Sequence, residues 1–329
     1  MLKEDQGITE LDGIARDGSI YYSTFVSPSD VQVAQLEPAS LAIAVGPTRF
    51  IDTFLGRNGN LSFSPDGKWI AWTSGPNREP AAPGMSVVVR AAAGGEEKVI
   101  PAIRNFRAWF PDSKALLNER LNPIGRGGDG QAIFERVEVQ DGRTTELYRG
   151  DPLPFVTVAP DGNALLGLRC NAPRPCDLVR YDLRTKSETV ETLSEISRNV
   201  LGTPIEISPD GKWMAVFGGL ASGSGRGLFV RPTAGGKLVE LVRETATEGF
   251  GQGLTWTHDS KQIIYAVTAP SQGIWFPQAF KAVPVGGGAQ KIIPLKGSQP
   301  SLDPSGRLVY TVSSARSEIW LARNLLPSN

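Results

Sequence analysis

The chain has 329 residues, of which 40% are hydrophobic, and its 34 basic and 34 acidic side chains give a formal net charge of zero. A chain of this length can bury a large core. Proteins that bind nucleic acid usually carry a basic excess, so the balanced charge argues against a nucleic-acid partner. The longest uninterrupted aliphatic run, residues 41–45, is far shorter than the roughly 20 apolar residues that cross a bilayer, so we expect no membrane insertion.

Frequent glycines and prolines divide the chain into short segments. There are 37 Gly and 25 Pro residues, and no stretch keeps an i, i+3, i+4, i+7 apolar pattern over three turns. This combination predicts an all-β chain with many short strands.

A four-residue motif, clearest in Ser64-Pro65-Asp66-Gly67, recurs along the whole chain. Pro presets the first corner of a type I turn, Asp fits the next position, and Gly supplies the left-handed conformation that closes a tight hairpin. The third positions of the copies are 49, 46, 49, 49, 49 and 46 residues apart and are Asp17, Asp66, Asp112, Asp161, Asp210, Asp259 and Ser305. A regular period of this size indicates a repeat architecture.

Each repeat has room for four strands in about 47 residues, which is the pattern of a β-propeller blade. We predict one domain, residues 1–329, with seven four-stranded blades at residues 11–45, 60–100, 106–148, 155–193, 204–242, 253–295 and 300–326. The last repeat ends after its third strand, so residues 7–10 are expected to add the missing outer strand and close the ring. Because the first repeat departs from the pattern, six regular blades plus an irregular segment form the alternative.

Two copies of the repeat carry a family resemblance. Residues 63–71 and 207–215 each read as an apolar residue, Ser-Pro-Asp-Gly-Lys and an apolar strand. This pattern resembles the WD40-like repeats of the TolB-type β-propeller superfamily, and the resemblance covers essentially the full length. Residues 317–327 are similar to the end of bacterial propeller modules fused to serine/threonine kinase or winged-helix regulator domains. The superfamily includes translocation accessories, sensor modules and the propeller domains of serine peptidases, so the resemblance implies the fold and leaves the function open.

The sequence presents no recognisable catalytic set. The single histidine, His258, occupies the Pro position of a corner turn, and no G-x-S-x-G elbow occurs. Two cysteines are too few for a zinc site, whereas a hard-ion site of carboxylates and Asn has no linear signature and stays open. We therefore expect no enzyme activity, cofactor or metal. A lactonase-like hydrolase or lyase that uses the central channel, or the propeller domain of a larger peptidase, is the alternative.

The two cysteines, Cys170 and Cys176, flank a five-residue loop between two predicted strands of one blade. Such a cross-strand pair can reach the Cα separation of a disulfide, about 4.4 to 6.8 Å. The polar residues 1–11 lack the apolar core of a secretory signal, which leaves a cytoplasmic and a mature extracytoplasmic protein both open. A disulfide favours the extracytoplasmic location, periplasmic in a bacterium.

The loops between the second and third strands gather on one face of a propeller, where recognition usually takes place. Arginine and aromatic side chains commonly anchor binding surfaces, and several arginines together favour an anionic group. The candidates on these loops are Arg78, Arg120, Arg126, Arg174, Arg226, Trp275 and Phe276. Each arginine could instead be a solvated charge that neighbours such as Glu79, Glu119 and Asp129 neutralise. We expect a monomeric, non-catalytic binding or sensing propeller that presents these loops to a protein or peptide partner.

Overall fold

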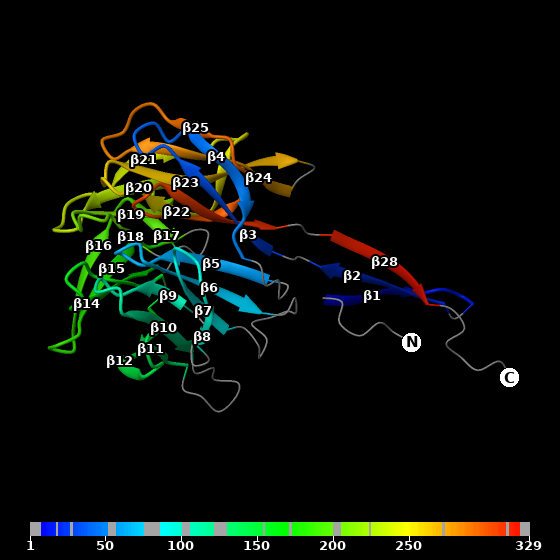
Figure 1. Cartoon of the computed structure of the whole chain (residues 1–329), viewed down its shortest axis with the longest axis horizontal. Helices are drawn as coiled ribbons and strands as arrows, with labels where there is room; N and C mark the ends of the chain where they lie inside the picture. The colour runs from blue at the N-terminus through cyan, green and yellow to red at the C-terminus, as the bar shows by residue number, and fades with distance from the viewer. Residues whose placement is uncertain are drawn as a thin grey trace.

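The computed structural model describes residues 8–17, 19–26, 29–51, 57–75, 86–100, 106–121, 130–153, 155–170, 173–199, 205–223, 225–271, 274–313 and 316–322. Across these ranges the chain forms 28 strands and no helix, and therefore no helix that could span a bilayer. The prediction of an all-β propeller is confirmed, with the blades arranged as a ring in Figure 1.

Five blades follow one another along the chain, each an antiparallel sheet whose first strand is the innermost. Blade A contains β5 (Arg57–Phe63), β6 (Trp69–Gly75), β7 (Ser86–Ala91) and β8 (Lys98–Ile100), and blade B contains β9 (Phe106–Trp109), β10 (Ala115–Leu121), β11 (Ala132–Glu138) and β12 (Thr144–Gly150). Blade C contains β13 (Thr157–Val158), β14 (Ala164–Arg169), β15 (Cys176–Asp182) and β16 (Ser187–Leu193). Blade D contains β17 (Ile196–Asn199), β18 (Glu206–Ile207), β19 (Trp213–Leu220), β20 (Arg226–Pro232) and β21 (Val239–Arg243). Blade E contains β22 (Gly249–Trp256), β23 (Gln262–Ser271), β24 (Ile274–Pro284) and β25 (Lys291–Ile293).

The sixth blade, blade F, combines both ends of the chain. Its two inner strands are β26 (Ser298–Leu302) and β27 (Arg307–Ser313), and its two outer strands are β3 (Ser29–Leu36) and β4 (Ile43–Arg49). Inner strand β26 contacts both β22 of blade E and β5 of blade A, so the ring closes at six blades. The sequence predicted seven blades, with six as the alternative; among the described residues the strands pair as six blades and one additional three-stranded sheet.

The remaining three strands form a separate sheet in the order β1 (Ile8–Ile14), β2 (Ile20–Val26) and β28 (Arg316–Ala322), which projects away from the ring in Figure 1. Strand β2 continues into β3, and β27 continues into β28. Ile20 pairs with Ala322 and Gln35 with Arg307, and one register runs through both halves of this ribbon. The hairpin predicted as the inner part of a first blade therefore lies outside the ring.

The N-terminal part of the chain closes the ring, but with different residues from those predicted. Residues 8–14 pair with β2, whereas residues 29–49 supply the two outer strands of blade F. Burial explains the difference: Val31, Ala34 and Leu36 in β3 are at most 2% exposed, whereas Leu11 and Ile14 in β1 are 65% and 66% exposed. Placing β3 against β27 removes more apolar surface from water than placing β1 there would.

The hydrophobic core of the described residues consists of six clusters, each between two neighbouring blades. The cluster between blades F and A packs Val31 and Val309 against Leu61 and Trp72. It is built like the clusters that join blades adjacent in sequence, so the ring is held together all the way round.

The corner turns form the tight turns that the motif predicts, and they also connect neighbouring blades through hydrogen bonds. Within one turn, the Ser64 hydroxyl donates to Asp66 Oδ1 at 2.6 Å, and the Lys68 N–H donates to the same oxygen at 3.0 Å. The Asp66 N–H donates to Ser113 Oγ in the next blade at 3.1 Å. Gly67 has a φ of +68°, and a Cβ there would stand 2.6 Å from Pro304 of blade F. Glycine thus allows both the turn and its close approach to the neighbouring turn.

Candidate functional site

The predicted binding residues that the structure describes lie where second strands meet third strands, at one end of the blades. Arg78 and Arg126 lie outside the described residues. Arg120 Nη2 is 3.1 Å from Glu135 Oε1 on the neighbouring strand, and the Arg226 guanidinium pairs with the Glu244 carboxylate through two hydrogen bonds. Partners within their own blades neutralise these two arginines, which leaves less positive charge for an anionic ligand than the sequence suggested.

The aromatic pair Trp275 and Phe276 belongs to a β-hairpin. Ala269 pairs with Phe276, Pro270 with Trp275 and Ser271 with Ile274, so Trp275 and Phe276, which were predicted to lie on a loop, belong to β24 and pair with β23. The Phe276 side chain is 46% exposed. The hairpin therefore presents at least one large apolar side chain to solvent at this end of the ring.

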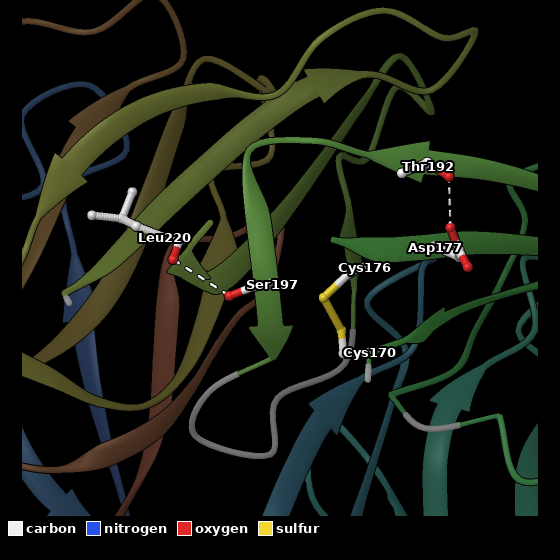
Figure 2. Close-up of a disulfide and its surroundings, with 6 residues drawn as sticks. All are labelled: Cys170, Cys176, Asp177, Thr192, Ser197 and Leu220. Atoms are coloured by element: carbon white, nitrogen blue, oxygen red, sulfur yellow. Dashed lines mark hydrogen bonds between the residues drawn. A yellow bond between two sulfur atoms is a disulfide. The ribbon is translucent and has the colours of Figure 1, made fainter. Parts of the chain in front are cut away.

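A disulfide joins Cys170 to Cys176 (Figure 2), and the exposed Arg174 lies between them in the sequence. Cys170 and Cys176, whose pairing was expected from the sequence, are joined with a Cα–Cα distance of 4.3 Å. Cys176 is fully buried in the cluster between blades C and D, which also contains Ile196. The bond thus fastens a surface turn to the packed core.

A cavity of about 770 Å³ lies in the central channel and is a second candidate site. The innermost strands of all six blades line it, together with the corner-turn residues Pro65, Pro111, Pro160, Pro209, His258 and Pro304. The cavity therefore lies toward the corner-turn face, opposite the end that carries the predicted arginines. Its volume falls within the range of about 300–1,000 Å³ that is usual for ligand pockets.

Residues at equivalent positions of the six repeats form a ring that lines this cavity. Three residues before the Pro position of each corner turn stand Ser62, Ala108, Thr157, Glu206, Thr255 and Ser301, and all six line the cavity. Two of the hydroxyls connect neighbouring inner strands. Ser301 Oγ accepts a hydrogen bond from the Phe63 N–H at 3.0 Å, and Thr255 Oγ1 accepts one from the Leu302 N–H at 3.4 Å.

Glu206 is the exception in this ring. Its side chain is only partly exposed, and burial raises the pKa of its carboxyl to about 8. Its backbone is fixed, because the Trp256 indole N–H donates to the Glu206 carbonyl oxygen at 3.2 Å. Among the residues that the structure describes, no hydrogen bond or ion pair to the carboxyl group is found.

The other charged residues in the cavity lining are engaged in the walls. Arg107 Nε donates to Glu119 Oε2 at 2.6 Å, and Asp210 accepts a hydrogen bond from the Ser208 hydroxyl at 2.6 Å. That hydrogen bond lowers the pKa of Asp210. His258 is exposed at the corner turn, in agreement with its interpretation as a turn residue, although it also contributes to the cavity mouth. Within the described ranges, no three His, Cys, Asp or Glu side chains are grouped so that they could hold a metal ion.

Glu206 was not among the predicted site residues, because it stands out only when the repeats are aligned with one another. A single Glu before a corner turn is an ordinary surface residue in most strands. Placed in the same column as five small residues around a shared axis, it becomes the one long, ionisable side chain in the ring.

Comparison with known proteins supports the fold and leaves the function open. No protein-family model and no curated protein matches the chain. TolB from Agrobacterium tumefaciens is similar with a TM-score of 0.58 and 14% identity, covering 88% of this chain and 99% of that one. TolB from Acinetobacter baumannii gives a TM-score of 0.56 and 15% identity over 90% of this chain, which spans 66% of its length.

A peptidase structure also shares the propeller architecture. The acylaminoacyl peptidase of Pyrococcus horikoshii gives a TM-score of 0.51 and 14% identity, covering 96% of this chain and 51% of the peptidase. At these identities the similarity concerns the fold alone. The chain has a TolB-like β-propeller fold, as its repeats predicted.

Proposed function

We propose that this chain is a non-catalytic binding propeller that recognises a segment of a protein or a peptide partner in its central channel. The observation that carries the proposal is the cavity of about 770 Å³, whose lining combines apolar residues, hydroxyl-bearing residues and Glu206, whose carboxyl has no hydrogen-bond partner among the described residues. A ligand pocket needs such a mixture, because apolar walls supply affinity and a few polar groups fix the orientation.

The arrangement supports binding over catalysis. A nucleophile must stand beside a base, and neither the hydrogen bonds of Arg107 nor those of Asp210 form such a pair. The lactonase-like and peptidase alternatives would need an ion site or a second domain, and no observation among the described residues favours either one.

The projecting sheet supports a partner that is itself a protein. On β1, β2 and β28, large apolar side chains are exposed by 38% to 77%: Leu11, Ile14, Tyr21, Ile319 and Leu321. Contiguous exposed apolar surface on a folded protein commonly marks an interaction site. Phe276 on the β23–β24 hairpin, which is 46% exposed, is a further exposed apolar side chain at the loop end of the ring.

The disulfide supports an extracytoplasmic location, periplasmic in a bacterium. Disulfides persist in oxidising compartments, whereas cysteines in the cytosol are kept as reduced thiols. We include this location in the proposal, together with a monomeric ring that needs no second copy to complete its core.

Selection of peptides from a displayed random library on the immobilised protein tests the proposed function. Peptides that bind should lose affinity for Ala108→Tyr, which places a phenol ring in the cavity, and keep it for Phe276→Ala at the loop end. Melting curves of both variants would verify that the ring is intact. Selected peptides that ignore Ala108→Tyr would remove the channel from the proposal.

A further inference from the structure

The ring of equivalent positions shows what the fold requires at Glu206. Ser301 and Thr255 use short hydroxyls to join one inner strand to the next, and Ala108 shows that even a methyl group is sufficient. A Ser or Thr at position 206 would therefore satisfy the architecture. The fold supplies no reason for a carboxyl group there.

The carboxyl group also costs stability. Transfer of an unpaired carboxylate from water into a low-dielectric site is unfavourable, and the group responds by holding its proton. The raised pKa of Glu206 is consistent with this cost. A buried carboxyl that no other described residue satisfies is characteristic of a site prepared for a ligand.

The surroundings of Glu206 select the charge of that ligand. Arg107 lines the same cavity but is already paired with Glu119, and Asp210 is held by Ser208 in its turn. His258 stands at the mouth on the corner turn of blade E. An anionic ligand would therefore meet a carboxyl group and no unpaired arginine, whereas a cation would meet the carboxyl group as its partner.

A neighbouring indole reports on the surroundings of Glu206. Trp256 lines the cavity from the next blade and donates its indole N–H to the Glu206 carbonyl oxygen at 3.2 Å. A divalent metal would need several oxygen ligands, whereas Glu206 is the single carboxylate in its ring of six positions.

We propose that Glu206 is the recognition carboxylate for a cationic group, a primary ammonium or a guanidinium, carried by the ligand that enters the channel. This inference rests on the proposed function and names the chemistry that the site accepts. The cation forms charge-assisted hydrogen bonds with the carboxylate. Its binding releases the proton that Glu206 holds in the empty channel.

The first experiment uses small probes that do not depend on a peptide being found. The wild-type protein, Glu206→Gln and the exposed-site control Glu96→Gln are titrated with n-butylammonium, n-butylguanidinium and neutral 1-pentanol, while the Trp256 indole N–H is followed by NMR. We expect saturable shifts with both cations for wild type and Glu96→Gln, and none for Glu206→Gln. Absence of cation-dependent shifts in the wild type, or equal shifts with 1-pentanol, would overturn the proposal.

The second experiment uses the selected peptides and separates the two claims. A basic residue should be enriched, and its replacement by norleucine should weaken binding to wild type by about tenfold or more, or about 1.4 kcal/mol, and binding to Glu206→Gln far less. Channel-binding peptides without a basic residue would refute the cation inference and leave the binding function standing. A titration with Ca²⁺ alone that shifts the same indole signal would instead assign the carboxyl to a metal.

Discussion

Replacing Glu206 with Gln should stabilise the protein, and by more as the pH rises. The amide keeps the size of the side chain but has no charge to bury. In the folded protein the carboxyl keeps its proton up to a pKa of about 8, above its ordinary value of 4.5. Between these two values the folded state binds a proton that the unfolded state has released, so the stability of the wild type falls as the pH rises through this window.

The size of the effect follows from the shift. Each unit of pKa difference corresponds to about 1.4 kcal/mol in the free energy of unfolding. Across the full window the wild type therefore loses at most about 5 kcal/mol of stability, and about 3 kcal/mol of this is lost by pH 7. Water in the cavity screens the charge and lowers these figures. Well below pH 4.5 the carboxyl is protonated in both states, and the wild type and the variant should differ little for this reason.

Denaturant unfolding of wild type, Glu206→Gln and Glu96→Gln at about pH 5, 7 and 9 measures the effect. The difference in free energy of unfolding between Glu206→Gln and wild type should grow from pH 5 to pH 9, while Glu96→Gln should follow the wild type. A difference that stays constant across the three pH values would show that Glu206 is not desolvated in the folded protein.

Three further predictions concern the ring. Deleting residues 1–26 should leave the melting temperature nearly unchanged, whereas deleting residues 1–49 should lower it clearly, because only the second deletion removes β3 and β4 from blade F. Equal effects of the two deletions would contradict ring closure by β3 and β4. Thiol labelling of the native, unreduced protein should find no free cysteine, and labelling of both Cys170 and Cys176 would refute the disulfide. Ser301→Ala should cost roughly 1 kcal/mol in denaturant unfolding, because the Phe63 N–H loses its inter-blade acceptor; an unchanged midpoint would mean that this hydrogen bond adds nothing to ring stability.

The corner-turn motif predicted most of the architecture because its information is local. Ser64, Pro65, Asp66 and Gly67 specify a turn through their own hydrogen bonds and backbone angles, and the same chemistry recurs in each blade. The motif could not distinguish a hairpin inside the ring from one outside it. The choice between β1 and β3 as a partner for the last blade depends on burial across more than 270 residues of sequence, which no local pattern contains.

The candidate site was less accessible from the sequence for a related reason. Arg120 and Arg226 looked like free surface charges because their partners, Glu135 and Glu244, are neighbours only after the strands pair. Glu206 resembles an ordinary surface residue in the linear sequence, because the residues that distinguish it lie at the equivalent positions of the other five blades. An alignment of the repeats shows that it is the one long, ionisable residue at this position.

Binding in the channel is best tested by a crystal structure of the protein with a selected peptide. We expect the peptide to occupy the central channel, with its ammonium or guanidinium group within hydrogen-bond distance of Glu206 and beside Trp256. A peptide bound to the projecting sheet or to the β23–β24 hairpin, with the channel unoccupied, would contradict it.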